Sequence, residues 1–434
     1  MIIIDSALDR LEREGRPLKV AMAGAGYMGR GIAFQMLTAT RGMRLVAIAN
    51  RTPADARRAY HEGGIETVRS IQSAVELDEA IAAGCYSVTE NASALCEAEE
   101  VDVIIEATGE VEFGAHVAVA AIAHRKHIVL MNAELDATIG PLLKARADQA
   151  GVVVTNADGD QPGVIMNLYR FVRTIGFRPV LAGNIKGLQD PYRTPETQKG
   201  FAEKYHQKPR MVTSFADGTK ISMEMAVVAN ATGHRVGRRG MYGPRCTHVK
   251  EALTLFPIEQ LLDGGLVDYV LGAEPSPGVF VLGYNEQPIP RRYMTYHKMG
   301  DGPLYVFYTP YHLCNFEVPI TVARAALFHD ATVAPRGAPV CEVMTCAKRD
   351  LRAGDVLDGI GGFTVYGMLE NADCFHRSDY LPMGLAQGCQ LTRDVVRDQP
   401  IKNSDVQIPA GRLADRLRRE QDAHFLRAEV AANG

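Results

Sequence analysis

Three glycines at Gly24, Gly26 and Gly29 stand between an apolar run, LKVAMAG, and a helix-like stretch, GIAFQMLTAT. In this context the first glycine permits a tight turn, the second lets the backbone approach a pyrophosphate, and the third lets the helix pack on the strand. The amino end of the helix then faces the anion. The pattern predicts a dinucleotide site that includes the intervening Tyr27 and Met28. A glycine-rich turn without a ligand is the alternative.

The next strand-like run, LVAIAN, ends in Asn50, Arg51 and Thr52. At this place NAD-specific proteins carry an acid against the ribose 2′-hydroxyl, and no acid is present here. Arg51 could pair with a 2′-phosphate while its neighbours add hydrogen bonds, which favours NADPH; an exposed arginine without a role is the alternative. Later strands end at Thr108 and Asn132, which we expect to flank the nicotinamide, because ligands lie beyond the carboxyl ends of such strands.

Apolar, strand-like runs alternate with helix-like stretches from residue 17 to residue 155, which predicts a parallel sheet covered on both faces. Longer strand candidates and helices follow, and then short strands and turns. We therefore expect an α/β protein of four parts: a Rossmann domain (1–157), a mixed α/β catalytic and dimerisation domain whose last helix could return to the Rossmann domain (158–333), a small all-β module (334–408) and a C-terminal helix (409–434).

The composition limits the partners that the chain could have. Its 434 residues carry a formal net charge of −4, so we expect no nucleic-acid partner, which would need a broad basic field. No apolar run approaches the roughly 18–20 residues that span a bilayer, and we expect no membrane association. The eight cysteines are scattered without CxxC spacing, which indicates reduced thiols in a cytoplasmic protein.

Four stretches of the second domain resemble one family: NADGDQPGV (156–164), GNIKGLQDPY (183–192), SFADGTKISME (214–224) and YTPYHLCNFEVP (308–319). With the Rossmann pattern they resemble homoserine-dehydrogenase-like oxidoreductases that carry a C-terminal SAF domain. The SAF part rests on AKRDLRAGDVLDGIGG (347–362) and QPIKNSDV (399–406). The similarity covers nearly the whole chain and is greatest to the branch of DXR-like (DRL) proteins.

The DRL branch converts 1-deoxy-D-xylulose 5-phosphate to 2-C-methyl-D-erythritol 4-phosphate with NADPH. The resemblance therefore implies isoprenoid precursor synthesis in the methylerythritol phosphate pathway, inhibition by fosmidomycin, and a homodimer or higher homo-oligomer. The motifs do not separate this activity from that of an NAD(P)-dependent dehydrogenase or oxidoisomerase of another sugar acid or hydroxy-amino acid. A non-catalytic NADP(H)-binding sensor is a third alternative.

A ketol rearrangement followed by hydride transfer needs polarised vicinal oxygens and a proton relay. The family places a lysine against the reacting oxygen, which implies this role for Lys186; a surface lysine is the alternative reading. Lys204 and Lys220 are further candidates. A divalent metal, Mg²⁺ or Mn²⁺, would take carboxylates, for which we select Asp190 and Glu224. No spacing distinguishes these two from the other candidate acids that the domain offers, namely Asp158, Asp160, Asp217 and Glu317.

The run GHRVGRRGMYGPRCTHVK (233–250) is basic and rich in glycine and contains no acid. Clustered guanidinium groups on a flexible backbone suit a phosphate. We therefore expect Arg235, Arg238 and Arg239 to hold the phosphate of a small phosphorylated sugar substrate. An exposed loop or a contact between subunits is the alternative.

Overall fold

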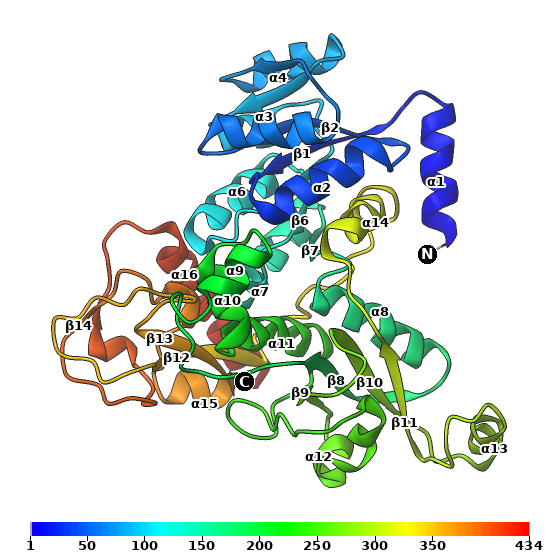
Figure 1. Cartoon of the computed structure of the whole chain (residues 1–434), viewed down its shortest axis with the longest axis vertical. Coiled ribbons are helices and arrows are strands. Elements are labelled where there is room, and N and C mark those ends of the chain that lie inside the picture. Colours follow the sequence, from blue (N-terminus) through cyan, green and yellow to red (C-terminus); the bar gives the residue numbers. More distant parts are fainter. Residues whose placement is uncertain (1, 434) are drawn as a thin grey trace. The chain divides into compact units, whose positions relative to one another are not determined.

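The computed structural model describes residues 2–433, and the chain divides into two units (Figure 1). The first unit is discontinuous and takes Met1–Asp160, Leu313–Ala334 and Leu413–Gly434, whereas the second takes Gln161–His312 and Pro335–Arg412. Residues 1 and 434, the outer ends of the predicted Rossmann domain and C-terminal helix, lie outside the described residues. The predicted boundary at residue 157 falls close to the first division between the units.

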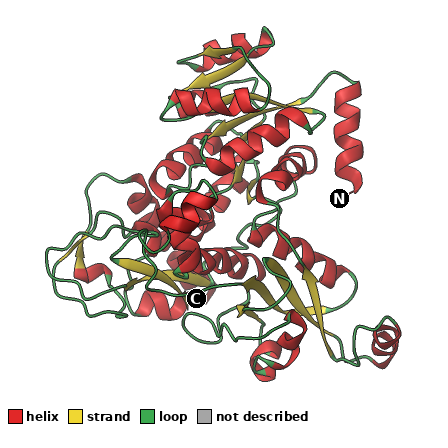
Figure 2. Cartoon of the chain, viewed as in Figure 1, coloured by secondary structure: helices red, strands yellow, loops and turns green. Residues whose placement is uncertain are grey.

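A parallel seven-stranded sheet forms the centre of the first unit (Figure 2). In sheet order its strands are β3 (Val68–Ser70), β4 (Tyr86–Thr89), β2 (Met43–Ala49), β1 (Leu18–Ala23), β5 (Val103–Glu106), β6 (His127–Leu130) and β7 (Val154–Asn156). The connecting helices are α2 (Tyr27–Thr38), α3 (Pro53–Glu62), α4 (Ala74–Ala82), α5 (Ala92–Glu97), α6 (Val111–Ala123) and α7 (Ala133–Ala150). The observed α/β fold with a Rossmann-like sheet confirms the predicted fold class.

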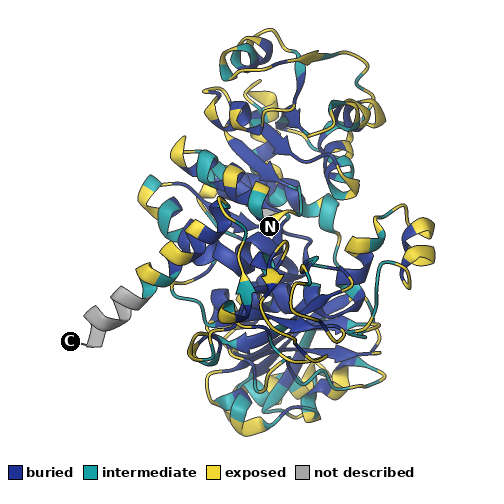
Figure 3. Cartoon of the chain, turned by 90° about the vertical axis from the view of Figure 1, so that its left-hand side faces the viewer, coloured by how far each residue is buried: buried dark blue, intermediate teal, exposed yellow. Residues whose placement is uncertain are grey.

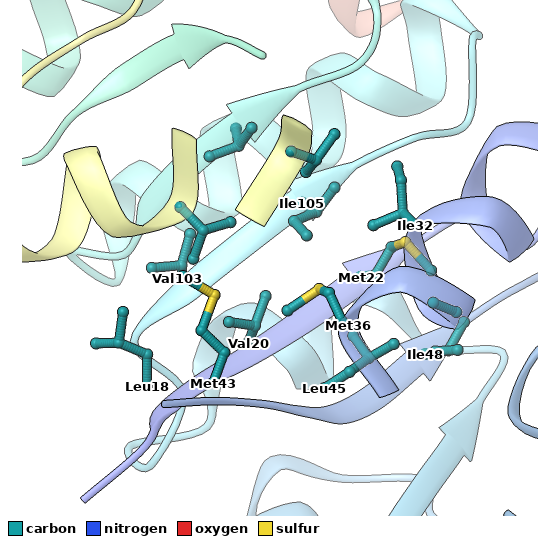
Figure 4. Packing of buried hydrophobic residues seen from close by; sticks show 14 of the residues in the cluster. Leu18, Val20, Met22, Ile32, Met36, Met43, Leu45, Ile48, Val103 and Ile105 are labelled. Atoms are coloured by element: carbon teal, nitrogen blue, oxygen red, sulfur yellow. The ribbon is translucent and has the colours of Figure 1, made fainter. Parts of the chain in front are cut away.

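Three helices from outside this alternation complete the first unit: α1 (Ile2–Arg13), α14 (Cys314–Phe328) and α16 (Leu413–Asn433). Residues of α1 and α14 join the core on one face of the sheet, where Val20, Met22 and Ile105 pack with residues of α2 (Figure 4). The central strands β1, β2 and β5 carry buried apolar side chains on both faces, because a parallel sheet is covered on both sides. Helix α14 is the last helix of the predicted catalytic domain, and it returns to the Rossmann domain, as we considered possible from the sequence.

Helix α16 compensates for a proline within α7. Pro141 has no N–H and disturbs the helical bonds around it. Instead, the backbone N–H of Leu142 donates to the side chain of Gln421 at 3.1 Å, and the guanidinium of Arg418 donates to the carbonyl of Thr138 at 3.2 Å. The C-terminal helix is therefore a structural part of the first unit.

The second unit contains a four-stranded sheet in the order β11 (Leu304–Thr309), β10 (Gly278–Tyr284), β8 (Arg178–Lys186) and β9 (Leu266–Leu271). Strand β10 is antiparallel to both neighbours, and β8 and β9 are parallel. The helices of this part are α8 (Gln161–Thr174), α9 (Lys199–Lys204), α10 (Pro209–Ala216), α11 (Thr219–Thr232), α12 (Ile258–Leu262) and α13 (Pro288–Tyr296), with a 3₁₀ turn, η1 (Val249–Thr254).

Residues 335–412 form a predominantly β segment that belongs to the second unit. It contains the strand pairs β12 (Cys341–Ala347) with β13 (Val365–Asn371) and β14 (Gln390–Leu391) with β15 (Val406–Gln407). Its helical elements are α15 (Ala372–Arg377), η2 (Met383–Leu385) and η3 (Asn403–Asp405). The structure thus groups the predicted β module with the middle of the chain.

Helix α11 lies in the interior of the second unit, in contact with β8 and β9 of the sheet and with β12 and β13 of the β segment. All its residues except Lys220 are buried. Buried residues also make up most of the strands in both units (Figure 3). Among the residues described, no helix has the length and apolar character needed to cross a membrane.

Candidate functional site

The glycine loop after β1 has the shape that the sequence predicted. Gly24 has a φ of +109°, and a Cβ there would lie 2.6 Å from the carbonyl oxygen of Ala107. A Cβ on Gly29 would lie 2.3 Å from the carbonyl oxygen of Gly24, so close packing of α2 requires this glycine. A Cβ on Gly26 would meet nothing within 4 Å. The open space at Gly26, at the amino end of α2, fits a dinucleotide pyrophosphate.

The three residues after β2 divide into two kinds. Asn50 braces the glycine loop, because its Oδ1 accepts from the N–H of Ala25 at 3.1 Å and its Nδ2 donates to the carbonyl of Thr52 at 2.9 Å. Its side chain is thus used within the protein. Arg51 is exposed and has no hydrogen bond or ion pair to the described residues, so its guanidinium can pair with an anion. Thr52 is also exposed.

Thr108 and Asn132 lie at the carboxyl ends of β5 and β6, as predicted, but their side chains have internal partners. The N–H and hydroxyl of Thr108 both donate to Oε1 of Glu106. The side chain of Asn132 caps α7 through the N–H of Leu135 at 3.0 Å and donates to the carbonyl of Glu110 at 3.1 Å. Burial raises the pKa of the Glu106 carboxyl to about 7. The side chains of Thr108 and Asn132 are thus used in hydrogen bonds within the first unit.

A second set of polar side chains lies in the second unit, around the carboxyl end of β8. We call Gln161, Asn184, Lys186, Lys220 and Glu224 the β8 cluster. Asn184 Nδ2 donates to Oε2 of Glu224 at 3.3 Å. With its amide oriented to match its neighbours, Gln161 donates to both Glu224 oxygens at 2.6 and 2.5 Å and accepts from Asn184 at 3.2 Å. Glu224 is 1% exposed, so these bonds stabilise a buried carboxyl group.

The strand and the helix place both lysines of the β8 cluster beside this carboxyl. Lys186 lies two residues beyond Asn184 on the same face of β8, and Lys220 lies one turn before Glu224 on the same face of α11. The segments next to β8 and α11 fix their relative direction. The N–H of Asp190, just after β8, donates to the carbonyl of Ala216, just before α11, at 2.8 Å.

At the other end of α11, the N–H of Arg235 donates to the carbonyl of Gly265, where β9 is about to begin. Since β9 is parallel to β8, α11 runs antiparallel to both strands. Lys186 and Lys220 therefore lie at the same end of the Asn184–Glu224 contact. Both are partly buried. The β8 cluster combines two cations with one buried carboxyl, which suits a substrate with oxygens that must be polarised.

Lys204 stands apart from this cluster. It is exposed at the end of α9, with its ammonium 5.1 Å from the ring centre of Tyr205. The structure therefore brings together two of the three predicted lysines. Sequence reasoning missed Gln161 and Asn184. The available signal for Asn184 was its position two residues before Lys186, which places both side chains on one face of a strand.

The predicted metal ligands do not form a ligand set. Asp190 forms an ion pair with Arg193 at 3.0 Å, whereas Glu224 is bonded to Gln161 and Asn184. Within residues 2–433, no group of three or more His, Cys, Asp or Glu side chains could hold a metal ion. Asp190 and Glu224 thus have different protein partners in the structure, and their role as metal ligands stays a prediction.

The other acids considered for metal binding also have protein partners. Asp158 is buried and accepts from Arg324 at 3.2 Å, from Thr321 and from Thr332. These bonds attach α14 to the end of β7 within the first unit. Asp217 pairs with Lys348, Asp160 accepts from the thiol of Cys314 at 3.9 Å, and Glu317 accepts from the N–H of Leu313 at 3.3 Å.

The three arginines of the 233–250 loop bind different partners instead of a common anion site. Arg235 pairs with Asp373, and Arg239 donates to Glu370 and to the hydroxyl of Tyr380, each at 2.8 Å. Arg238 donates to the backbone carbonyls of Met241 and Tyr242. Acids distant in the sequence thus neutralise two of these arginines and tie the loop to the β segment, and the phosphate clamp stays a prediction.

Comparison with known proteins supports two domain assignments. Residues 24–155 match the family model for the NAD-binding domain of homoserine dehydrogenase, and residues 159–318 match that for the catalytic domain of oxidoreductase DRL. No curated protein matches the chain.

Solved structures share only distant similarity. An NAD-binding oxidoreductase from Klebsiella pneumoniae is 20% identical over 41% of this chain and 44% of its own, with a TM-score of 0.29. 1-Deoxy-D-xylulose 5-phosphate reductoisomerase from Zymomonas mobilis is 18% identical over 48% of this chain and 56% of its own, with a TM-score of 0.33. Biliverdin reductase from Synechocystis sp. PCC 6803 is 14% identical over 72% of this chain and 91% of its own, with a TM-score of 0.38.

The chain thus spans less than two thirds of the length of several structures that it matches. The two family models match adjacent segments, and the division between them lies close to the first division between the structural units, after Asp160. The glycine loop falls in the first segment and the β8 cluster in the second. Residues 24–155 are thus similar to the NAD-binding domain of homoserine dehydrogenase, and residues 159–318 are similar to the catalytic domain of oxidoreductase DRL.

Proposed function

We propose that this protein is an NADPH-dependent reductoisomerase that converts 1-deoxy-D-xylulose 5-phosphate to 2-C-methyl-D-erythritol 4-phosphate. The observation that carries the proposal is the β8 cluster, which lies within the segment matched by the DRL catalytic domain. The reaction needs two vicinal oxygens polarised and a proton moved between them. Two lysines beside one buried carboxyl can supply both functions.

The two ammonium groups have the more direct role in this proposal. Lys186 and Lys220 bind the carbonyl oxygen and an adjacent hydroxyl of the substrate and stabilise negative charge that develops on them during rearrangement of the carbon skeleton. Glu224 accepts and returns the hydroxyl proton, and Gln161 and Asn184 hold its carboxyl in position. When bound, NADPH supplies the hydride that reduces the resulting aldehyde.

The cofactor choice rests on Arg51. Its guanidinium is exposed and has no partner among the described residues, and no acid follows β2; both features favour a dinucleotide with a 2′-phosphate. The described residues offer no ligand set for a divalent metal, so no step is assigned to a metal ion. The test reaction should nonetheless be run with and without Mg²⁺ or Mn²⁺, because substrate oxygens could complete a coordination sphere.

The experiment is NADPH oxidation with 1-deoxy-D-xylulose 5-phosphate, with and without fosmidomycin. We expect turnover that fosmidomycin inhibits. Lys186→Ala and Lys220→Ala should each lower kcat by roughly 10²–10³-fold, the usual range for the loss of a group that stabilises negative charge developing on oxygen. Lys199→Ala is the matched control, because Lys199 is exposed on α9 and its removal should change kcat little. Turnover that survives both cluster substitutions would contradict the assigned roles.

One observation favours a second candidate, a dehydrogenase or oxidoisomerase of an unphosphorylated sugar acid. The arginines expected to hold a phosphate are paired with Asp373, Glu370 and backbone carbonyls. A sugar acid would place its carboxylate against the lysines of the β8 cluster and would need no phosphate site. NADPH oxidation or NADP⁺ reduction with a set of sugar acids distinguishes the two, and NADPH binding without turnover would indicate a sensor.

A further inference from the structure

The β segment of the second unit contains a cavity of about 340 Å³, which we call the β-segment cavity. Its lining comes from Arg239 in the loop after α11, from Tyr380, and from residues within 393–402. Of the three arginines in the predicted phosphate clamp, Arg239 lines the cavity, whereas Arg235 and Arg238 do not. Sites for small ligands measure roughly 300–1,000 Å³, so the cavity is large enough for a small metabolite.

The β-segment cavity lies on the face of the β12–β13 pair that is turned away from α11. Gly367 on β13 faces α11, since a Cβ there would lie 3.1 Å from the side chain of Thr219. Successive residues of a strand point to opposite faces. Glu370, three residues later on β13, therefore points to the other face, where its carboxylate accepts from Arg239. Because the β8 cluster includes residues of α11, the β12–β13 pair separates the cavity from that cluster.

Three cations and one acid line the β-segment cavity. Arg239, Arg393 and Lys402 supply the positive charges, and the acid is Asp394. The carboxylate of Asp394 forms an ion pair with Arg352 at 2.7 Å, so a residue outside the lining neutralises it. The lining therefore favours a ligand that carries negative charge.

Two buried acids hold the guanidinium groups of the cavity in fixed positions. Glu370 accepts from Arg239 Nε at 2.8 Å, and Asp405 accepts from Arg393 Nε and Nη2 at 2.5 and 2.8 Å. Both acids are 5% exposed. These bonds take only part of the N–H donors of each guanidinium, and the remaining donors are available to an anion. A guanidinium that is already held in place loses less conformational freedom when it binds a ligand.

The hydroxyl of Tyr380 gives the most specific indication of a ligand. Tyr380 is 8% exposed, and its oxygen accepts from Arg239 Nη2 at 2.8 Å. Among the residues that the structure describes, none accepts the proton of this hydroxyl. A buried donor without an acceptor costs free energy, which an anion oxygen in the cavity would recover. Lys402 is opposite Tyr380 in an antiparallel bridge, so its side chain lies on the same face.

The rest of the lining includes apolar side chains. Val395, Val396 and Pro400 contribute carbon surface to the cavity, and Val396 is 66% exposed. Small-molecule sites typically combine an apolar wall with a few placed polar groups that fix the orientation of the ligand. The combination of carbon surface with charged donors therefore suits an organic anion better than an inorganic ion.

We propose that the β-segment cavity binds a small phosphate ester. A phosphate monoester carries about two negative charges and three strong acceptor oxygens, which match the three cations and the hydroxyl of Tyr380. The carbon part of the ester packs on Val395 and Val396. A carboxylate has a single charge and fewer oxygens, so it would leave part of this donor set without a partner. The site goes beyond the proposed reaction and does not depend on it.

Isothermal titration calorimetry with ribose 5-phosphate tests the site. We expect saturable binding to the full chain, which Lys402→Glu and Tyr380→Phe each weaken about tenfold or more, the effect of one lost charge-assisted hydrogen bond. Circular dichroism should show both variants folded. Arg377→Glu is the matched control, because Arg377 is exposed on α15 and does not line the cavity, and it should bind like the wild type. The proposal would be overturned by equal affinities of all three variants, or by no binding to the wild type at concentrations on the order of 10 mM.

Further titrations identify the ligand class and the place of binding. Ribose and inorganic phosphate should each bind roughly tenfold more weakly than ribose 5-phosphate or worse, because each lacks one of the two parts that the cavity contacts. Inorganic phosphate that binds as tightly as the ester would overturn the assignment to an ester. The double variant Lys186→Ala/Lys220→Ala should keep its affinity for ribose 5-phosphate. Loss of binding in this variant would place the probe at the β8 cluster and contradict a separate site.

Discussion

The ion pair between Lys348 and Asp217 gives the most specific prediction about how the β8 cluster is held. Lys348 follows β12 and is 4% exposed, and its ammonium donates to Asp217 Oδ2 and to the carbonyls of Arg193 and Gly362, each at 2.8 Å. Asp217 lies just before α11 and also accepts from the N–H of Thr219 at 2.9 Å. The pair thus joins the β segment to the helix that carries Lys220.

Lys348→Met keeps an unbranched side chain that is one heavy atom shorter, but leaves the Asp217 carboxyl buried without its cation. Breaking one partner of a buried pair costs about 3–5 kcal/mol, which corresponds to a fall in Tm of roughly 6–20 °C for a domain of this size. The double variant Lys348→Met/Asp217→Asn should lose less, because it leaves no unpaired charge. Thermal unfolding followed by circular dichroism measures both.

The pH dependence provides a second check on the same variant. Burial already raises the pKa of Asp217 above its ordinary value, and loss of the Lys348 ammonium raises it further. A carboxyl with a raised pKa binds more protons when folded than when unfolded, so stability falls as the pH rises through that range. The Tm deficit of Lys348→Met should therefore be smaller at about pH 5 than at about pH 8.

A control separates this effect from the general loss of an ion pair. Arg352 and Asp394 form an ion pair at 2.7 Å on the surface of the same β segment, with side chains that are 79% and 56% exposed. Arg352→Met should change the Tm little, because exposed pairs contribute little to stability. The reasoning would be refuted by a Lys348→Met deficit no larger than that of Arg352→Met, or by a deficit that does not change with pH.

Three further outcomes follow from the first unit. Gly26→Ala should fold normally but bind NADPH weakly in a fluorescence titration. Gly29→Ala should also lower the Tm, because its Cβ would lie 2.3 Å from the carbonyl oxygen of Gly24. Equal Tm values for the two variants would contradict this expectation. Arg51→Ala should weaken NADPH binding about tenfold or more, the effect of a lost charge-assisted bond, and leave NADH binding unchanged. Burial raises the pKa of Glu106 from an ordinary 4.5 to about 7, so the free energy of unfolding should fall by about 3 kcal/mol as the pH rises through that range. Denaturant titrations at several pH values measure this dependence, which Glu106→Gln should remove.

Features encoded by neighbouring residues could be predicted from the sequence. The glycine loop depends on the backbone of one strand–turn–helix unit, so its spacing alone predicted the turn at Gly24, the opening at Gly26 and the close packing at Gly29. The alternation of strands and helices likewise predicted the parallel sheet. Lys186 and Lys220 were selected by resemblance, and their shared position beside Glu224 became visible only when α11 was seen to run antiparallel to β8.

Features that depend on distant partners could not be predicted in this way. The arginine-rich loop contains no acid within 233–250, and nothing local indicated that Asp373 and Glu370 would neutralise Arg235 and Arg239. From the sequence, Asp158 was a candidate metal ligand. In the structure it accepts from Arg324 of α14, which lies 166 residues later in the sequence. In each case a charged side chain appeared to need a ligand, and the fold supplied a protein group.

The identity of the reaction product tests the central proposal most directly. The purified protein is incubated with NADPH and 1-deoxy-D-xylulose 5-phosphate labelled with ¹³C at two adjacent carbons, and the product is analysed by NMR. A reductoisomerase yields branched 2-C-methyl-D-erythritol 4-phosphate, in which the coupling between labelled carbons across the migrating bond is lost, and Lys186→Ala yields little of it. A straight-chain alcohol with the coupling intact, or no product at all, would contradict the proposal.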